Sequence, residues 1–355
     1  MKKALIVGAG IAGCTAGIAL VQRGWSVTVI EKRSSAEAIG SGIFVYSNGL
    51  DNFNKLGLLA EVEQAGFIIP DGKNVYTDNV GKHITDVYYP KILGIKRSTL
   101  QQVLTDKLKI LGVDITLNTS VERYNLDNYD LVIGADGINS TLRKMFWPDI
   151  TTTYAGFEVW RSTHKRPKDL VDKITMFGVG KRLGIMPISQ EELYIWAVLP
   201  VAEKRYYEKN IWPTVMWEKF VEFAGPARPL LDELMHGAEV YYTPAEEVVM
   251  PTPWHKDNII LIGDAAHAST PFSGQGGAMA VHDAVLLGEM IDAKLDLATF
   301  ADRRYPMCKY VQDTSRAVGL AGATEDYTSY SKMLEAMPTI AQQKIDEFYN
   351  TIETL

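Results

Sequence analysis

The chain contains little cysteine and has no excess of positive charge. Cys14 and Cys308 are the only cysteines among its 355 residues. Their separation permits a bridge, but two buried thiols in a reducing cytoplasm are the preferred interpretation. The formal net charge of −7 argues against a surface for nucleic acid or anionic membrane. A hydrophobic share of 46% is typical of a globular protein, and the length suggests about two domains.

Long uncharged runs are also scarce, with one exception at the N-terminus. Residues 4–22 carry no charge, which satisfies the length rule for a membrane span or a signal peptide. However, the segment contains four glycines and changes its pattern from a short strand (residues 3–10) to a helix (11–24). A strand, a tight turn and a helix explain it better than a single span. We therefore expect a cytoplasmic protein.

The sequence lacks the spacing patterns of metal sites and of several hydrolases. Its histidines show no ligand spacing with cysteine or acidic partners, and they are His83, His164, His236, His255, His267 and His282. Neither a G-x-S-x-G elbow nor a Walker loop occurs. No metal site is predicted.

A glycine-rich loop follows the first predicted strand. Gly8, Gly10 and Gly13 form the pattern G-x-G-x-x-G. In such a loop the first glycine permits a sharp turn, the second lets the backbone approach a pyrophosphate, and the third lets the helix press on the sheet. Ile11 and Ala12 begin that helix, whose free N–H groups and dipole favour phosphate. A plain βαβ unit without a ligand is the alternative.

The second predicted strand ends at an acidic residue. Glu31 stands where a carboxylate can accept hydrogen bonds from a ribose. Lys32 and Arg33 follow it and are included in the predicted cofactor site. A free carboxylate argues against a 2′-phosphate in this pocket, while NAD and FAD both remain possible ligands.

Two further segments run from an apolar strand into a helix. In residues 129–143 the strand ends at Asp136, and Asn139 or Ser140 can cap the helix that follows. An Asp-Gly pair usually indicates a hairpin, but no return strand follows here. Residues 258–264 end at Gly263 and Asp264, where a carboxylate can bind the hydroxyls of a polyol chain.

A second glycine-rich loop precedes the next predicted helix. It has the pattern Pro-x-x-Gly-x-Gly-Gly, and its members are Pro271, Gly274, Gly276 and Gly277. The glycines leave backbone N–H groups unobstructed at the start of a helix, where they can stabilise an anion. A glycine-rich helix start without a ligand is the alternative.

These ordered segments resemble the fingerprints of group A flavoprotein monooxygenases, the aromatic hydroxylases related to para-hydroxybenzoate hydroxylase. The resemblance covers residues 1–316. It implies that the first glycine loop binds the ADP half of FAD, that the Asp136 segment serves FAD and NAD(P)H, and that Asp264 holds the ribitol. It also implies that Gly42, in the stretch 40–58, lies at the flavin edge and that Arg97 touches the cofactor.

The resemblance has two departures. Ala278 stands where the family commonly has asparagine, and His282 where an acidic residue is frequent. Both concern contacts with the flavin ring rather than FAD binding itself.

Residues 151–255 change character to short β-rich runs separated by turns, as in an antiparallel sheet. In the family such a sheet forms the substrate pocket, and residues 212–236 look helical and are expected to cover its outer face. Arg182 and Tyr194 resemble the substrate-contacting pair of bacterial urate-hydroxylating relatives. The alternatives are a solvent-facing arginine and a tyrosine on the sheet face. Phe272 and Pro271, in the loop beside the flavin, complete the predicted substrate site. His267 could assist deprotonation of a phenol, but a histidine that closes a strand-end loop is more often structural.

The predicted fold is α/β, a Rossmann-like FAD-binding domain with an inserted antiparallel substrate sheet and a C-terminal helical segment. The expected bounds are 1–71, 96–150 and 256–300 for the FAD domain, 72–95 and 151–255 for the substrate domain, and 301–355 for the helices.

The predicted enzyme is an FAD-dependent monooxygenase that uses NAD(P)H and O₂ to hydroxylate an aromatic or heteroaromatic small molecule through a flavin C4a-hydroperoxide. We expect a monomer or homodimer. The alternatives are a reductase or dehydrogenase of the same fold, and a module that binds flavin or NAD without catalysis. Substrate identity and the choice between NADH and NADPH are not predicted.

Overall fold

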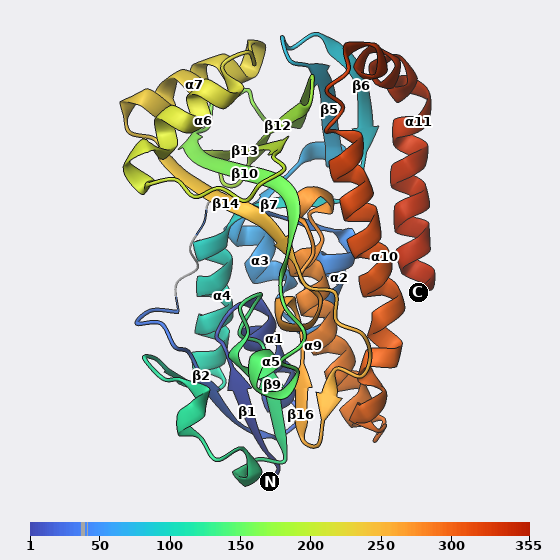
Figure 1. The fold of residues 1–355 in the computed structure, drawn as a ribbon. Coiled ribbons are helices and arrows are strands. Elements are labelled where there is room, and N and C mark those ends of the chain that lie inside the picture. Colours follow the sequence, from blue (N-terminus) through green and yellow to red (C-terminus); the bar gives the residue numbers. More distant parts are fainter. Residues whose placement is uncertain (37–39, 41) are drawn as a thin grey trace.

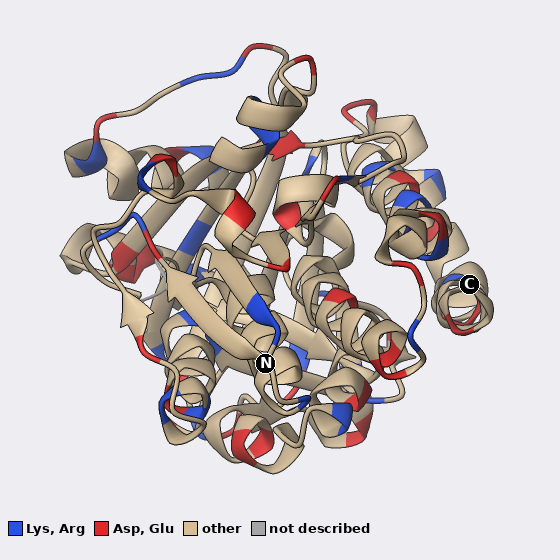
Figure 2. Ribbon diagram, turned by 90° about the horizontal axis from the view of Figure 1, so that it is seen from below, with Lys and Arg blue, Asp and Glu red and all other residues tan. Residues whose placement is uncertain are grey.

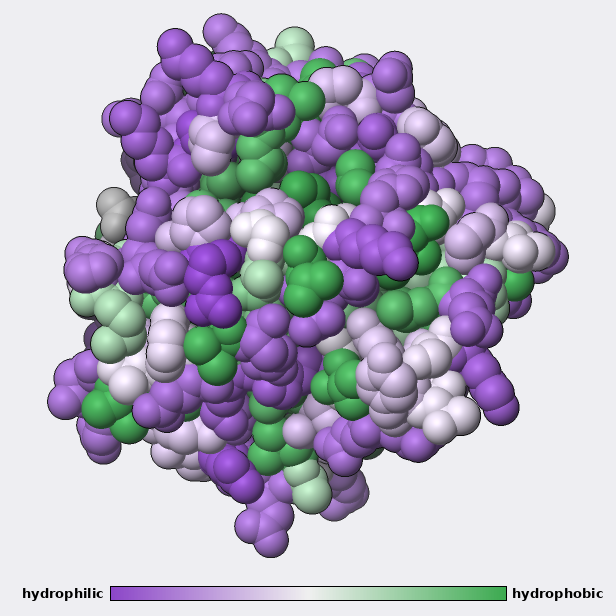
Figure 3. All heavy atoms as spheres, turned by 90° about the horizontal axis from the view of Figure 1, so that it is seen from above, coloured by the Kyte–Doolittle hydropathy of each residue, from purple (hydrophilic) through white to green (hydrophobic). Residues whose placement is uncertain are grey.

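The computed structural model describes residues 1–36, 40 and 42–355. Ser41, within the stretch that resembles the flavin edge, lies outside the described residues. Figure 1 shows an α/β layer at the N-terminal end of the molecule, a second sheet above it, and two long helices along one side. Acidic and basic residues are interspersed around the α/β layer (Figure 2). Apolar and hydrophilic residues alternate on the opposite face (Figure 3).

The α/β layer is built on a six-stranded sheet with the order β15-β16-β9-β1-β2-β8. Its strands are β1 (Lys3–Val7), β2 (Ser26–Ile30), β8 (Ile115–Thr116), β9 (Leu131–Gly134), β15 (His255–Lys256) and β16 (Ile259–Leu261). Neighbouring strands are parallel except β15 and β16. The apolar runs are explained by burial, since four of the five β1 residues are buried.

Helices accompany this sheet, and glycines in one of them, α1, let it pack closely on β1 and α4. The helices are α1 (Ile11–Val21), α4 (Arg97–Ile110), α5 (Thr141–Phe146) and α9 (Gly276–Asp292). The N-terminal apolar run is therefore a strand and a buried helix, as expected. A Cβ on Gly17 would lie 3.0 Å from Leu108 of α4, so a larger residue would separate the two helices. In the described part of the chain, no helix is long and apolar enough to cross a membrane.

The second sheet has seven strands in the order β14-β10-β13-β12-β11-β5-β6. They are β5 (Lys73–Asp78), β6 (His83–Tyr88), β10 (Thr153–Lys165), β11 (Lys173–Gly178), β12 (Lys181–Pro187), β13 (Glu192–Pro200) and β14 (Glu239–Glu247). The sheet is mixed rather than purely antiparallel, because β5 pairs parallel with β11. Its outer face packs through Trp160 and Leu183 against α6 (Trp212–Phe220) and α7 (Arg228–Glu233), so the prediction of covering helices at 212–236 is confirmed.

A small three-stranded sheet, β3-β7-β4, joins the two layers. Its strands are β3 (Gly42–Tyr46), β4 (Phe67–Ile68) and β7 (Ile92–Lys96), accompanied by α2 (Ser47–Lys55) and α3 (Leu59–Ala65). A Cβ on Gly94 would lie 2.0 Å from the carbonyl oxygen of Pro187 in β12. This contact brings β7 against the inner face of the larger sheet.

The remaining helices are α8 (Asp264–His267), α10 (Phe300–Ala321) and α11 (Tyr327–Thr354). The last helix docks on the edge of the seven-stranded sheet. Gln342 Oε1 accepts a hydrogen bond from Tyr88 N at 2.7 Å, and Gln342 Nε2 donates to Tyr88 O at 2.9 Å. Tyr330 donates to the carbonyl oxygen of Phe177 at 2.9 Å. The end of the chain is therefore part of the wall of the inner face.

Candidate functional site

Four loops with polar or glycine residues meet at one edge of the six-stranded sheet. They follow β1 at Gly8, β2 at Glu31, β9 at Asp136 and β16 at Gly263. Because these strands are parallel neighbours, their carboxyl ends share one edge. In open α/β sheets this edge is where ligands bind.

The three glycines of the first loop have different geometric roles. Gly8 has a φ of +102°, and a Cβ there would lie 2.5 Å from the carbonyl oxygen of Ala135. A Cβ on Gly13 would lie 1.9 Å from the carbonyl oxygen of Gly8. At Gly10 no described atom lies within 4 Å of such a Cβ. Gly8 and Gly13 are therefore required by the fold, whereas Gly10 faces open space.

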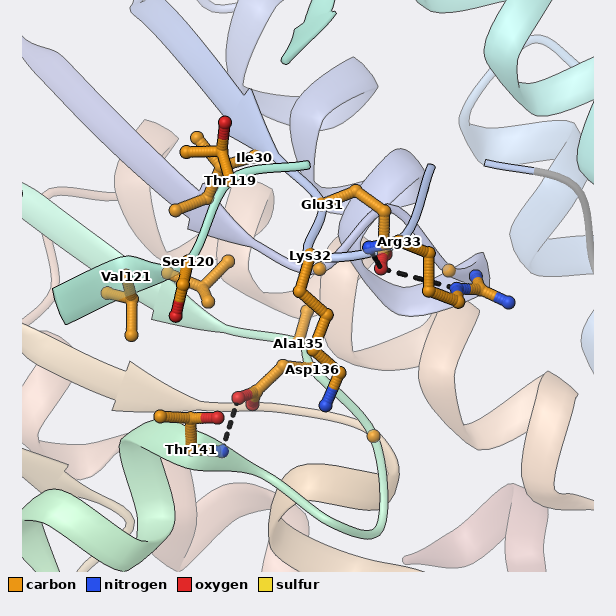
Figure 4. Close-up of a pocket in the computed structure, with 14 residues that line it drawn as sticks. Ile30, Glu31, Lys32, Arg33, Thr119, Ser120, Val121, Ala135, Asp136 and Thr141 are labelled. Carbon is orange, nitrogen blue, oxygen red and sulfur yellow. Dashed lines mark hydrogen bonds and ion pairs between the residues drawn. The ribbon is translucent and has the colours of Figure 1, made fainter. Parts of the chain in front are cut away.

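A cavity of about 190 Å³ lies beside this loop (Figure 4). It is lined by Val7, Gly8, Gly10, Ile30, Glu31, Lys32, Arg33, Thr119, Ser120, Val121, Ala135, Asp136, Gly137 and Thr141. Six of the predicted cofactor residues are in this set. Ile11, Ala12 and Gly13 form the adjoining first turn of α1. Residues 119–121 also line the cavity, but no sequence motif predicted this.

Glu31 is almost buried and strongly hydrogen-bonded. Its Oε2 accepts from Ala9 N at 3.0 Å, and its Oε1 accepts from Arg33 N at 3.0 Å and Arg33 Nε at 3.2 Å. Burial raises the pKa of the Glu31 carboxyl, but these hydrogen bonds and the Arg33 charge outweigh it, so the pKa lies below its usual value. Glu31 therefore stays ionised at the rim of the cavity, where it can accept from a hydroxyl.

Asp136 accepts a hydrogen bond from the first residue of α5 and also lines the cavity. Its Oδ2 accepts from Thr141 N at 2.5 Å, and Ser140, the N-cap of α5, accepts from Arg143 N at 2.9 Å. The second oxygen, Oδ1, is buried without a hydrogen-bond partner among the described residues. Arg143 links this loop to α8, which follows β16, because it donates to the carbonyl oxygen of Ala265 at 2.8 Å. A ligand donor in the cavity can satisfy the open oxygen.

The second glycine-rich loop leads into α9, as predicted. Gly274 has a φ of +68°, and α9 begins at Gly276. A Cβ on Gly277 would lie 2.9 Å from Ile43 of β3. The first N–H groups of an α-helix have no intrahelical acceptor, so this end of α9 presents donors to the space between the glycine loops.

Gly263 and Asp264 lie next to the cavity rather than in its wall. Gly263 has a φ of +57°, and a Cβ there would lie 2.8 Å from Ala12 Cβ. Asp264 is exposed at the first position of α8. The structure thus brings the β16 end against the start of α1.

Gly42 and Arg97 occupy the junction between the two layers. A Cβ on Gly42 would lie 2.2 Å from the ring of Tyr194, so this glycine lets β3 approach the seven-stranded sheet. Arg97 is exposed at the start of α4 and lies against Gly40, whose Cβ would be 3.3 Å from Arg97 Cδ. Tyr194 is 3% exposed and its ring packs on Phe44, with 5.5 Å between centroids.

Arg182 is buried on the inner face of the seven-stranded sheet. Its Nε and Nη2 have no hydrogen-bond partner within the described ranges, and its guanidinium lies 5.6 Å from the ring of Phe272. Phe272 packs edge-on against Phe157 at 4.7 Å. The solvent-facing alternative for Arg182 is therefore wrong. Pro271, by contrast, is exposed.

The sequence did not indicate a polar role for two more groups on this face. Trp196 lies over Gly184, and its Nε1 is buried without a partner in the described structure. Lys173, at the start of β11, is 4% exposed. Leaving a buried donor unpaired costs about 1–3 kcal/mol, so Trp196 and Arg182 indicate a site for a ligand that carries acceptor atoms.

His267 belongs to a buried charged cluster behind the site. Its Nε2 lies 2.7 Å from Asp283 Oδ2, and Arg304 Nε lies 2.7 Å from Asp283 Oδ1. The donor atoms of His267, Asp283 and Cys308 lie within 4.8 Å of one another, an approach that the sequence spacing did not reveal. Both oxygens of Asp283 are already occupied, and Oδ2 also accepts from Gly263 N at 2.7 Å. The cluster ties α8, α9 and α10 together, which supports a structural role for His267.

Cys14 and Cys308 are both buried and free, as expected.

The fold and these strand-end loops define an α/β protein of the dinucleotide-binding class with a second, mixed sheet. Residues 1–313 match the family described as FAD binding domain. The chain belongs to this family, and the resemblance to group A flavoprotein monooxygenases is confirmed.

Individual relatives are similar over nearly the whole chain. The 2-heptyl-3-hydroxy-4(1H)-quinolone synthase of Pseudomonas aeruginosa is 28% identical over 372 residues, which cover 97% of this chain and 96% of the synthase. The crystal structure of Klebsiella pneumoniae HpxO complexed with FAD and uric acid has a TM-score of 0.84 at 23% identity, covering 99% of this chain and 97% of HpxO. The tetrameric 2-methyl-3-hydroxypyridine-5-carboxylic acid oxygenase has a TM-score of 0.78 at 26% identity, covering 97% and 96%.

The residues present fit an FAD molecule. Gly10 leaves space for a pyrophosphate against the start of α1, and Glu31 offers a carboxylate for ribose hydroxyls. The open Oδ1 of Asp136 is an acceptor for a further donor. FAD is the cofactor of this flavoprotein monooxygenase.

Proposed function

We propose that this protein hydroxylates an aromatic or heteroaromatic small molecule with O₂ and NAD(P)H, and that the inner face of the seven-stranded sheet binds the substrate. The observation that carries this proposal is the set of buried donors without partners among the described residues. They belong to Arg182 and Trp196, which lie near Phe272 in the loop that leads into α9. When bound, FAD supplies the electron transfer and oxygen activation that the reaction needs. The named substrates of the relatives, a quinolone product and uric acid, are ring compounds rich in acceptor atoms.

The residues of this chain have three tasks in the reaction. The first task is to bind FAD, which Gly8, Gly10 and Glu31 would hold at the sheet edge, with Asp264 and Asp136 as further contacts. As part of this task, the first N–H groups of α9 would stabilise negative charge on the ring system of the bound cofactor.

The second task is to orient the substrate, and the third is to exclude water. Arg182 and Trp196 donate to substrate oxygens or ring nitrogens, while Tyr194 and Phe272 form apolar walls. The burial of Arg182, of Tyr194 and of the indole nitrogen of Trp196 keeps water away from the reacting ring.

The test is a coupled measurement on the purified, FAD-loaded protein. Candidate phenols, hydroxylated N-heterocycles and quinolones are screened for stimulation of NADPH and NADH oxidation, with oxygen uptake recorded in parallel. We expect one class to stimulate both and to yield a product that carries one oxygen atom from ¹⁸O₂. Consumption of NAD(P)H without oxygen uptake, for every candidate, would support the reductase alternative and refute the proposal.

A further inference from the structure

Lys173 lies in a buried cage of aromatic rings on the inner face. Its Nζ is 4.5 Å from the ring centroid of Phe44, 5.6 Å from Tyr46 and 5.3 Å from Tyr89. It donates a hydrogen bond to the hydroxyl of Tyr46 at 3.1 Å. We call Phe44, Tyr46 and Tyr89 the aromatic cage. A lysine in such surroundings is unusual, because burial of an ammonium without a counter-charge is costly.

No ion pair joins Lys173 to a carboxylate in the part of the chain that the structure describes. Lys73, on the neighbouring strand β5, shows the ordinary arrangement, with Asp86 at 3.2 Å and Asp172 at 3.5 Å. Burial, together with the positive charge of Arg182, lowers the pKa of Lys173 to about 7.

The other titratable groups that face the cage cannot supply the missing charge. Tyr76 lies on β5, Tyr194 on β13 and Tyr349 on α11, and Tyr46 and Tyr89 belong to the cage itself. Burial raises the pKa of each of these tyrosines, so all five are neutral near pH 7. The remaining neighbour, Arg182, is positive. The cage therefore holds an amine that gains and loses its proton without a protein counter-ion.

The cage lies directly against the loop that starts α9. A Cβ on Gly274 would lie 3.1 Å from both Phe44 and Tyr46, the same rings that contact Lys173. One residue later, Gln275 Nε2 donates to the hydroxyl of Tyr349 at 3.4 Å. Phe44 and Tyr46 thus lie close both to Lys173 and to the loop whose backbone we assign to the flavin ring.

We propose that Lys173, as the neutral amine, accepts the proton of a ring hydroxyl on the substrate and then binds the resulting oxyanion together with Arg182. This inference rests on the proposed function and names the proton acceptor at that site. The O–H bond of the substrate breaks, an N–H bond forms on Nζ, and the electron pair stays on the oxygen, so no oxidant or reductant is needed. After the transfer, the oxyanion is paired with two cations, protonated Lys173 and Arg182. This attraction offsets the cost of burying the charged groups.

The transfer prepares the ring for hydroxylation. An oxyanion raises the electron density of its ring at the ortho and para positions, which electrophilic oxygen attacks. An acid–base group performs best when its pKa lies near the working pH, as that of Lys173 does. Arginine could not replace it, because a guanidinium does not give up its proton in proteins.

The first test uses 4-nitrophenol as a probe, since its neutral and ionised forms absorb at different wavelengths. The FAD-loaded protein is titrated with it at a pH below the probe's own pKa, without NAD(P)H. We expect ionised probe on the wild-type protein and neutral probe on Lys173→Met, which retains the length of the side chain but accepts no proton. Lys181→Met, on the next strand and paired with Glu222, is the matched control and keeps the wild-type spectrum. Equal ionisation of bound probe in wild type and Lys173→Met overturns the proposal.

The second test follows the amine itself. Protein labelled with ¹³C at lysine Cε is titrated by NMR, and the Lys173 signal is assigned by its absence from Lys173→Arg. We expect a midpoint near 7, an increase on binding 4-nitrophenol, and an increase in Arg182→Met. A midpoint near the usual lysine value of about 10.4 refutes the proposed role. Neither test requires turnover, so both stay distinct from a failure to find a hydroxylated product.

Discussion

The two glycines Gly10 and Gly13 give opposite expectations for the same substitution to alanine. At Gly13 the new Cβ would lie 1.9 Å from the carbonyl oxygen of Gly8, so α1 must move away from the loop. Alanine is the better helix former by about 1 kcal/mol, but overpacking of this kind costs about 1–3 kcal/mol or more. We expect Gly13→Ala to lower the free energy of unfolding of the FAD-free protein.

At Gly10 the free energy of unfolding is expected to change by less than about 0.5 kcal/mol. Its φ of −79° and ψ of −170° suit any residue, and no described atom lies within 4 Å of the new Cβ. Alanine is a poorer N-cap than glycine by several tenths of a kcal/mol to about 1 kcal/mol, and the reduced freedom of the unfolded chain returns about 0.4–1 kcal/mol.

The effect of Gly10→Ala appears instead in FAD binding, because its Cβ enters the space assigned to the pyrophosphate. We expect Kd to rise at least about tenfold, or about 1.4 kcal/mol. Urea unfolding of the FAD-free proteins and quenching of flavin fluorescence on binding measure the two quantities separately. Wild-type FAD affinity in a folded Gly10→Ala protein would refute the assignment of this space to the pyrophosphate.

Three further substitutions test other parts of the site. Asp283→Asn should lower the free energy of unfolding by about 3–5 kcal/mol because it breaks a buried charged cluster, whereas Asp292→Asn, at a 58% exposed carboxylate, should change it by less than about 1 kcal/mol. Burial raises the pKa of Asp283, but His267 and Arg304 outweigh this effect and hold the pKa below its usual value. The ionised carboxylate therefore stabilises the folded protein above about pH 4, and this stabilisation is lost as the pH falls through the lowered pKa. In Asp283→Asn the free energy of unfolding should consequently depend less steeply on pH in the acid range. Arg182→Ala should abolish substrate stimulation of NAD(P)H oxidation and leave FAD content unchanged, and loss of flavin would show that the arginine is misplaced. Asp264→Ala should retain less FAD through gel filtration than wild type, and an unchanged flavin-to-protein absorbance ratio would contradict its role.

The FAD-binding layer could be predicted because its signals are local. A glycine with positive φ such as Gly8, or a helix cap such as Ser140, depends on a few neighbouring residues, and short apolar strands place these loops at one edge of the sheet. The order of the loops along the chain then restricted the topology. The domain bounds remain predictions, although β7 pairs with β3 and β4 rather than with the seven-stranded sheet.

The inner face could be predicted only in part because its residues come together from distant segments. In the sequence, Lys173 resembles any surface lysine beside Asp172, and its cage is supplied by strands and a loop more than 80 residues earlier. Register with β5 and β12 decides that its side chain points inward. The parallel pairing of β5 with β11 likewise has no short-range signal. Arg182 was indicated only by resemblance, and its burial needed the structure.

The contact between Gln275 and Tyr349 joins the loop before α9 to a helix near the end of the chain. During synthesis the N-terminal Rossmann strands are made early. The contact with Gln275 forms only after α11 has been made and has packed along β6. The sheet edge with Gly8, Glu31 and Asp136 can therefore form on a nascent chain before α11 supplies Tyr349 to Gln275.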